Sequence, residues 1–365
     1  MGFKCGIVGL PNVGKSTLFN ALTQTAAAEA ANYPFCSIEP NVGEVGVPDE
    51  RLDKLAVIGK SAKIQPTRLT FVDIAGLVRG ASKGEGLGNQ FLGHIREVDA
   101  VAYVVRCFED DDITHVENRI DPVADAETVE TELMLADLDS LEKRRTTTEK
   151  KAKTGDKEAK AQVALIDKAL VLLREGRPAR QAQISAEEDA GWRALQLLTA
   201  KPVLYVCNVE EASAGKGNAF SAKVFERAMA EGAGAVVISA KIEAELAGLA
   251  PDERVAFLAD IGLEEAGLNR LISAGYKLLG LLTYFTVGPK EARAWTVTRG
   301  MKAPQAAGVI HTDFEKGFIR AETIAFEDYV RLNGEAGARE AGKMRLEGKE
   351  YMVADGDVMH FRFAN

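Results

Sequence analysis

Eight residues near the N-terminus, Gly9 to Ser16, read Gly-Leu-Pro-Asn-Val-Gly-Lys-Ser and match the pattern GxxxxGK[ST]. A β-branched run, Cys5 to Val8, precedes them, and a helical pattern follows them. The two glycines allow the backbone to curl so that successive N–H groups point at phosphate oxygens, and the N-terminus of the following helix adds partial positive charge. This motif predicts a phosphate-binding loop, and so a nucleotide-binding α/β domain.

The loop also predicts which atoms meet a nucleotide. The Lys15 ammonium is expected to bridge the β- and γ-phosphates, which makes Lys15 a catalytic candidate, and the Ser16 hydroxyl is expected to bind Mg²⁺. The alternative is an ordinary glycine turn with a surface lysine. The backbone N–H groups expected at the phosphates are those of Asn12, Val13, Gly14, Lys15, Ser16 and Thr17.

Apolar, β-branched runs alternate with helical patterns, such as Ser16 to Thr23 and Asn89 to Glu97, along most of the chain. This alternation predicts an α/β fold with a doubly wound, mostly parallel sheet that helices cover. The runs expected as strands are Cys5 to Val8, Leu69 to Val72, Val101 to Val105, Val203 to Cys207 and Val236 to Ile238.

A long helical insertion interrupts this alternation. From about Glu130 to Arg180 the chain has few aromatics, many Lys, Glu and Ala, and apolar residues at helical spacing, with a break at Thr154 to Asp156. The simplest solution is a hairpin of two antiparallel helices. A dimerising coiled coil is the alternative, but the short helical spans and the Gly155 break favour pairing within one chain, and so a monomer.

After Gly280 the sequence changes to short β-type runs around turns and one helical stretch, which predicts a separate small α+β domain. The expected boundaries are residues 1–130 and 201–280 for the nucleotide domain, 131–200 for the inserted hairpin, and 281–365 for the C-terminal domain. The β-type runs are Tyr284 to Val287, Ala294 to Val297, Tyr351 to Val353 and Met359 to Phe363.

Composition excludes several classes of protein. Of the 365 residues, 46% are hydrophobic, which is enough for ordinary cores, and no apolar run approaches the ~20 residues needed to span a bilayer. No secretory signal pattern follows Met1, so we expect a cytoplasmic chain without a membrane partner. The four cysteines are too dispersed for a CxxC metal site or a disulfide framework.

Charge is distributed unevenly. The net charge is -9, which argues mildly against nonspecific nucleic-acid binding. Residues 141–180, however, hold 12 basic and 6 acidic side chains, and residues 281–365 hold 12 of each, so these segments leave -15 for the rest. A solvated helical face is the ordinary explanation of the basic segment, but the same surface would suit the phosphates of RNA.

Two further segments fit a nucleotide site. Asp73 follows the second expected strand, where open α/β sheets place their ligands, and is expected to hold Mg²⁺ through water. The Gly76 N–H, three residues on, is expected at the γ-phosphate. The proline-broken loop from Asn32 to Pro40 suits a switch segment, in which Ser37 is the candidate to complete the Mg²⁺ shell. An ordinary loop serine is the alternative.

The motifs GLPNVGKS, DIAG at 73–76, NxxE at 208–211 and SAK at 239–241 together resemble the translation-factor-like GTPases, their Obg-related branch and, within it, the YchF family. The likeness covers essentially the whole chain, and residues 305–318 resemble the family's C-terminal β-grasp TGS domain. The resemblance implies a P-loop NTPase with an inserted hairpin and a TGS domain. It also implies nucleotide hydrolysis, a preference for ATP and association with the ribosome.

The base site can be argued from the residues. Guanine-specific GTPases carry NKxD, whose Asp accepts the ring N–H and exocyclic amine of guanine while the Lys stem covers the base. Here Asn208 is kept, Val209 replaces the Lys, and Glu211 replaces the Asp with one methylene more. Adenine has an acceptor where guanine has its ring N–H, so the change fits ATP, whose amine could donate to a carbonyl near Val209. The far wall is expected from Ser239, Ala240 and Lys241, through backbone N–H groups and the Lys241 stem.

Catalysis departs from the familiar pattern. Ras-like enzymes orient the attacking water with a Gln just after the DxxG glycine, but that position is Leu77. His115, in the acidic loop after the third expected strand, is the candidate to replace it, and the resemblance also suggests a histidine. A solvated loop side chain is the alternative. In related GTPases an Asn at the position of Asn12 seats K⁺ beside the phosphates; a polar turn residue is the alternative. Cys36 in the switch loop is a candidate redox sensor.

Three functions stay open on this reading. The first is a P-loop ATPase whose nucleotide state controls docking to a ribosome or another RNA–protein assembly. The second is a nucleotide-binding scaffold or chaperone-like protein with negligible hydrolysis, which Leu77 favours. The third is an ordinary GTPase. Competition of ATP against GTP and hydrolysis assays with and without ribosomes distinguish them.

Overall fold

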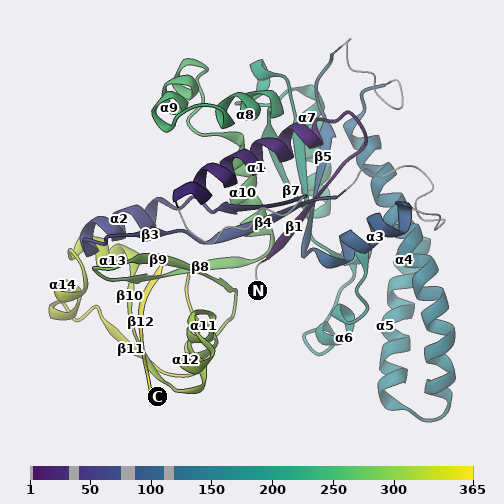
Figure 1. Ribbon diagram of the computed structural model, residues 1–365. Coiled ribbons are helices and arrows are strands. Elements are labelled where there is room, and N and C mark those ends of the chain that lie inside the picture. Colours follow the sequence, from purple (N-terminus) through teal and green to yellow (C-terminus); the bar gives the residue numbers. More distant parts are fainter. Residues whose placement is uncertain (1–2, 33–40, 75–86, 111–118, 365) are drawn as a thin grey trace. The chain divides into compact units, whose positions relative to one another are not determined.

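The computed structural model describes residues 3–32, 41–74, 87–110 and 119–364 (Figure 1), and of residues 26–32, 87–90 and 251 it describes the backbone alone. The chain forms two compact units. The first comprises Phe3–Gly43 and Thr70–Gly275, and the second comprises Glu44–Leu69 and Tyr276–Asn365. The finer division at residues 130, 200 and 280 stays a prediction.

Most of the first unit is built on a six-stranded sheet in the order β2-β4-β1-β5-β6-β7, whose strands β2 and β4 each extend a few residues into the segment assigned to the second unit. The strands are β1 (Lys4–Val8), β2 (Val42–Gly46), β4 (Arg68–Asp73), β5 (Ala100–Arg106), β6 (Val203–Asn208) and β7 (Gly234–Ile238). From β4 to β7 the strands pair in parallel, which confirms the α/β fold and the five expected strands. β2 is not among the predicted strands, because its two glycines leave only a short apolar pattern.

Helices cover both faces of this sheet. The helices of the first unit are α1 (Lys15–Asn32), α3 (Leu87–Glu97), α4 (Pro122–Lys153), α5 (Lys157–Arg174), α6 (Asp189–Arg193), α7 (Ala219–Glu231), α8 (Ala240–Ala247), α9 (Pro251–Asp260) and α10 (Gly267–Leu278), and α5 packs on α4 and not on the sheet (Figure 1). Every residue of β5 and β6 is buried, which in a parallel sheet requires cover on both faces. α1 packs against α8, and α4 packs against α7. None of the described helices is both long and apolar enough to cross a bilayer.

α4 and α5 form the expected helical hairpin (Figure 1). The break lies where the sequence predicts it: Gly155 adopts φ 97°, a left-handed conformation that favours glycine. The Asp156 side chain then accepts from the N–H groups of Glu158 and Ala159 and caps α5. The hairpin has its own apolar core, which includes Leu141, Leu165, Ile166, Leu170 and Trp192.

The second unit is an α+β domain with a sheet in the order β11-β10-β12-β8-β9-β3. Its strands are β3 (Ile64–Gln65), β8 (Leu281–Val287), β9 (Ala292–Thr298), β10 (Phe318–Ala325), β11 (Arg345–Glu347) and β12 (Asp357–Phe363). Its helices are α2 (Glu50–Gly59), α11 (Ala303–Ile310), α12 (Thr312–Lys316), α13 (Phe326–Arg331) and α14 (Glu335–Glu340). One apolar core joins α2 to the sheet through Leu55 and Phe285, and another joins α11 to it through Ala307 and Tyr284.

Two features of the second unit differ from what the sequence patterns indicate. Residues 44–69, early in the chain, supply α2 and β3, and their contact with Phe285 is too distant in sequence for a local pattern to reveal. The predicted strand from Tyr351 to Val353 is wrong. This segment makes an isolated bridge between Met352 and Lys302. The Ala303 N–H donates to the Tyr351 carbonyl, and the Val353 N–H donates to the Met301 carbonyl, so the segment pairs with the residues at the start of α11 and not with the sheet.

Candidate nucleotide site

The phosphate loop lies between β1 and α1, as predicted. Asn12 and Gly14 adopt left-handed backbone conformations, with φ 64° and 90°, so the chain curls just before α1 begins. A Cβ atom on Gly14 would collide with the side-chain amide nitrogen of Asn208, at the end of β6. Glycine is therefore required here by the backbone conformation and by the close approach of a distant strand.

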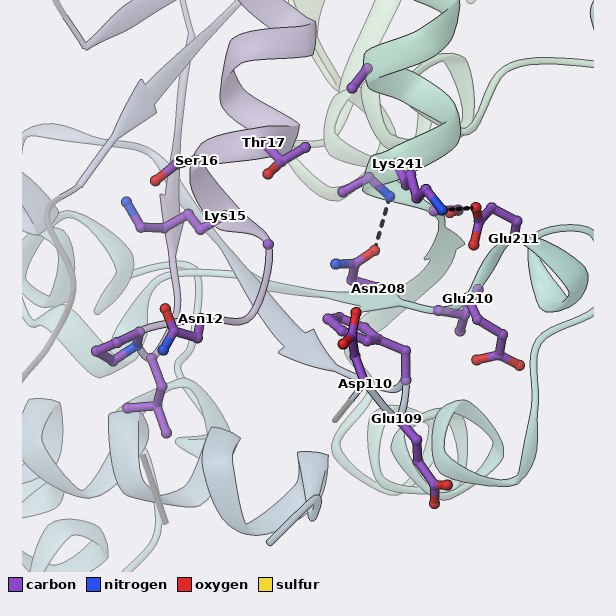
Figure 2. Close-up of a pocket in the computed structure, with 18 residues that line it drawn as sticks. Asn12, Lys15, Ser16, Thr17, Glu109, Asp110, Asn208, Glu210, Glu211 and Lys241 are labelled. Atoms are coloured by element: carbon purple, nitrogen blue, oxygen red, sulfur yellow. Dashed lines mark hydrogen bonds and ion pairs between the residues drawn. The ribbon is translucent and has the colours of Figure 1, made fainter. Parts of the chain in front are cut away.

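Lys15 and Asp73 meet at the phosphate end of the site. The Lys15 ammonium forms an ion pair with the Asp73 carboxylate, and both side chains are largely buried. Asp73 is the last residue of β4, and its N–H donates to the Asn41 carbonyl at 2.8 Å. Figure 2 shows Ser16 and Thr17 close to Lys15, at the start of α1. The two motifs that the sequence assigns to phosphate and metal thus share one site.

Asn208 joins the phosphate loop to the other end of the site. It is buried, its amide nitrogen donates to the Val13 carbonyl, and its side-chain oxygen accepts from the Ala240 N–H, each at 2.9 Å. Asn208 therefore holds three segments of the chain together. The Ala240 N–H, which the sequence reading places at the base, is already engaged by this bond.

Val209 and Glu211 occupy the positions of the Lys and Asp of guanine-specific GTPases. Val209 is buried, and its N–H donates to the Ile238 carbonyl at 2.8 Å. The Glu211 carboxylate is paired with the Lys241 ammonium across the site (Figure 2). This hydrogen bond lowers the pKa of Glu211 and raises the pKa of Lys241. Both groups are therefore charged at neutral pH, and the carboxylate is engaged by a lysine.

A cavity of about 890 Å³ joins these groups. The Ser239 hydroxyl is buried on its wall and has no hydrogen-bond partner within the described residues. The cavity thus brings the phosphate loop, the NxxE tetrad and the SAK segment to one place. The predicted residues that line it are Asn12, Gly14, Lys15, Ser16, Thr17, Asn208, Val209, Glu211, Ser239, Ala240 and Lys241.

The sequence singles out the acidic loop after β5 for His115 alone, but other residues of this loop also line the cavity. Phe108, Glu109 and Asp110 face it. The buried Arg106 holds this loop, because its guanidinium donates to the carbonyls of Phe108 and Asp110, both at 3.1 Å, and lies 4.7 Å from the centre of the Phe108 ring. An arginine at the end of an otherwise apolar strand is the signal that could have indicated this loop.

Two family models match the chain. One, described as 50S ribosome-binding GTPase, matches residues 4–137, and the other, YchF-GTPase_C, described as a protein of unknown function, matches residues 281–364. The ribosome-binding ATPase YchF of Haemophilus influenzae is 60% identical over 363 residues, which cover 100% of this chain and 99% of the relative. This chain belongs to the YchF family.

Other YchF proteins match over the same length. The ribosome-binding ATPase YchF of Bacillus subtilis is 55% identical and covers 100% of both chains. The solved structure of the Schizosaccharomyces pombe YchF GTPase is 38% identical, covers 99% of this chain and 98% of its own, and has a TM-score of 0.88. The match extends over both units and confirms the P-loop fold with its C-terminal domain. The two bacterial relatives are named ATPases, whereas the Schizosaccharomyces pombe protein is named a GTPase.

The candidates Ser37, Gly76 and His115 lie outside the described residues, as do Leu77, which takes the place of the Gln, and the candidate redox sensor Cys36. Within the described ranges no group of three or more His, Cys, Asp and Glu could hold a metal ion. Ser16 and Asp73 nevertheless fit Mg²⁺, which P-loop NTPases generally use. This ion prefers hard oxygen ligands, and a site of this kind combines one or two carboxylates with the phosphates of the substrate.

Proposed function

We propose that this chain is a Mg²⁺-dependent ATPase that hydrolyses ATP to ADP and phosphate, and that its nucleotide state controls association with the ribosome. The observation that carries the proposal is the base end of the cavity, where Val209 replaces a lysine and Glu211 is paired with Lys241. The bacterial relatives that match the whole chain are named ribosome-binding ATPases, which supports the same function.

The phosphate end supplies the binding groups. The backbone N–H groups of Asn12 to Thr17 and the Lys15 ammonium bind the phosphates, so Lys15 exchanges its contact with Asp73 for the substrate. The Asp73 carboxylate and the Ser16 hydroxyl are then available to hold Mg²⁺, with Ser37 as a further candidate. When bound, the ion supplies positive charge beside the phosphates. Gly76 remains the candidate for sensing the γ-phosphate.

The base end favours adenine over guanine. A guanine ring N–H and amine need a carboxylate acceptor, and the Glu211 carboxylate would have to leave Lys241, with which it forms an exposed ion pair, to accept from both. A buried donor without an acceptor costs about 1–3 kcal/mol. Adenine lacks that ring N–H and meets the apolar surfaces of Val209 and Phe108, while the Ser239 hydroxyl, which has no partner among the described residues, offers a polar contact.

Competition binding and phosphate release test this function. We expect ATP to displace a bound fluorescent nucleotide at lower concentration than GTP, and ribosomes to accelerate phosphate release. A scaffold would bind ATP without ribosome-stimulated release, and an ordinary GTPase would prefer GTP. A Lys15→Ala chain is the control for contaminating hydrolases, because it removes the phosphate-binding ammonium and should release no phosphate.

We propose that His115 orients the attacking water, because Leu77 has no hydrogen-bonding group. Replacing His115 with Ala should lower single-turnover hydrolysis by about 10²–10⁴-fold and leave ATP affinity unchanged. The control is His94→Ala, because His94 is an exposed histidine on α3. This variant should keep the wild-type rate. An unchanged rate in the His115 variant would end the proposal.

We propose K⁺ as a second ion beside Asn12, which lines the cavity. Hydrolysis should then be faster in potassium than in sodium buffer, because a fixed cation stabilises the charge that develops on the phosphates. Asn12→Gly tests the side chain while keeping the left-handed backbone at φ 64°, and it should remove the difference between the two salts. Equal rates for the wild-type chain in both buffers would count against K⁺.

The hairpin is the proposed ribosome contact. Several of its basic side chains are already paired, including Arg145 with Asp167 and Arg174 with Glu142. At the tip, by contrast, Lys150 and Lys151 are exposed and form no ion pair within the described residues. This uncompensated charge suits the phosphates of RNA.

Replacing Lys150, Lys151 and Lys153 with Gln should weaken ribosome binding. A plot of the logarithm of the binding constant against the logarithm of the salt concentration should become shallower by about one unit of slope for each replaced lysine that contacts a phosphate. Cosedimentation with ribosomes across a series of potassium chloride concentrations measures both effects. The matched control replaces the exposed Lys316, Lys343 and Lys349 of the second unit, with the same change in charge. If the two triple variants bound ribosomes with the same affinity and the same dependence on salt, the basic tip would be an ordinary solvated helical face.

We further propose that the chain acts in the cytoplasm as a monomer. α4 pairs with α5 of the same chain, so the hairpin core is complete without a second copy. A dimer in sedimentation velocity at micromolar concentration would contradict this.

A further inference from the structure

The second unit contains a cavity that the proposed nucleotide reaction does not use. Its volume is about 400 Å³, within the range of ligand-binding pockets. It lies where the pairing of β8 and β12 stops. These strands pair in parallel at one position, Val358 opposite Phe285. The same register would place His360 opposite Val287, a pairing that the structure does not record among the residues it describes.

The lining residues show that the cavity lies in the seam between the two strands. Neighbouring residues of a strand point to opposite faces of a sheet. Met359 and His360 are neighbours on β12, and both line the cavity; so do Thr286 and Val287, neighbours on β8. An occupant therefore meets both faces of the sheet and the main chain at the ends of both strands.

One side of the seam is aromatic. Trp295, Phe314 and Phe363 line it. The rings of Phe314 and Phe363 stack with their centres 3.8 Å apart, and the indole N–H of Trp295 donates to the Thr286 hydroxyl at 2.9 Å. These rings are held in place, so the aromatic side is a preformed surface.

The other side is mixed, with the apolar Ile324 and Met344 and with acidic residues. The acidic side chains that line the cavity are already paired with arginines: Glu322 with Arg362 at 3.0 Å, Glu335 with Arg339 at 2.6 Å, and Glu291 with Arg293 at 3.8 Å. Because these carboxylates are compensated, the lining favours an occupant whose inserted side chains are uncharged.

We propose that this seam binds an extended peptide segment of a partner protein, which adds as a strand along the edge of β12 beyond Val358. An extended strand matches the geometry, since its main chain can bond to the strand edge while its alternate side chains enter the aromatic and the mixed side. The compensated charges indicate uncharged side chains at the inserted positions, and the extended conformation favours β-branched ones. This site is separate from the nucleotide cavity and goes beyond the proposed ATPase.

Fluorescence of Trp295 tests the site directly. The chain has two tryptophans, so Trp192→Phe leaves Trp295 as the reporter. The probe is the peptide Lys-Thr-Val-Thr-Val-Thr-Lys with blocked ends, which contains no fluorophore. We expect a saturable change in Trp295 emission. The same peptide N-methylated at both valines should bind at least about tenfold more weakly, because it has lost main-chain donors.

Two variants with the same change in charge show where the peptide binds. Met344→Arg puts a long side chain into the seam, and Leu346→Arg puts one on the exposed face of β11, two residues away. The first should weaken binding at least about tenfold, and the second should leave it unchanged. Hydrogen exchange should show slower exchange of the Phe361 and Phe363 amides when the peptide is added.

Several results would overturn the proposal. Equal binding of the N-methylated peptide would indicate an apolar pocket without strand addition. Protection of β11 or β3 in place of β12 would place the peptide on an outer edge of the sheet. A partner peptide would be excluded as the occupant if the peptide showed no saturable binding up to its solubility limit. It would also be excluded if self-association of the chain, without added peptide, protected the β12 amides from exchange.

Discussion

A chain that carries both Val209→Lys and Glu211→Asp should change its preference from ATP to GTP, by at least about a hundredfold in the ratio of affinities. The double substitution restores the NKxD tetrad that begins at Asn208, whose side chain already bonds to the phosphate loop and to the start of α8. The Lys stem would cover the base. The shorter Asp would no longer reach Lys241 as Glu211 does, and its carboxylate would be free to accept from guanine.

Competition of ATP and GTP for a fluorescent nucleotide measures this preference, and Glu210→Asp is the matched control. Glu210 lies in the same loop, but its carboxylate accepts from the Asn218 amide at 2.9 Å and from the Ser213 hydroxyl. Shortening it should therefore leave the nucleotide preference unchanged. If the double variant still bound ATP over GTP as the wild type does, the choice of base would have to come from elsewhere in the cavity.

Replacing Glu130 with Ala should lower the free energy of unfolding of the hairpin, together with its contact with α7, by about 3–5 kcal/mol. The Glu130 side chain on α4 is only 4% exposed and forms ion pairs with Arg180 at 2.5 Å and with Arg227 at 3.1 Å. Both arginines also contact Glu231 on α7. Without Glu130, two buried guanidinium groups share one remaining buried carboxylate, and the desolvation of their charge is no longer compensated.

Glu127→Ala provides the control for this effect. Glu127 lies one turn earlier on α4 and also pairs with Arg227, at 2.8 Å, but its side chain is 60% exposed, so its loss should cost less than about 1 kcal/mol. Urea unfolding followed by Trp192 fluorescence, in a chain with Trp295→Phe, reports the hairpin separately from the second unit. Equal losses in the two variants would show that burial of the network does not set its contribution.

Where prediction from the sequence succeeded, the signal is local. The phosphate loop is recognisable because its glycines, lysine and serine are consecutive, and the buried strands because each is a short apolar run. Gly155 and Asp156 mark the hairpin turn, since one permits a left-handed conformation and the other caps the next helix. Prediction failed where partners are remote, as at α2, or where a short apolar run is held outside a sheet, as at Tyr351 to Val353.

The sequence by itself determined the kind of site this protein has: a phosphate loop, an acidic strand end and a base tetrad that departs from NKxD at Val209 and Glu211. Only the tertiary structure decided how these groups are used. It paired Lys15 with Asp73 and Glu211 with Lys241, engaged Asn208 on both sides, and brought Phe108 to the cavity through Arg106. The physical reason is that a motif specifies donors and acceptors along the chain, whereas ion pairs and burial depend on which distant segments the parallel sheet brings to the same edge.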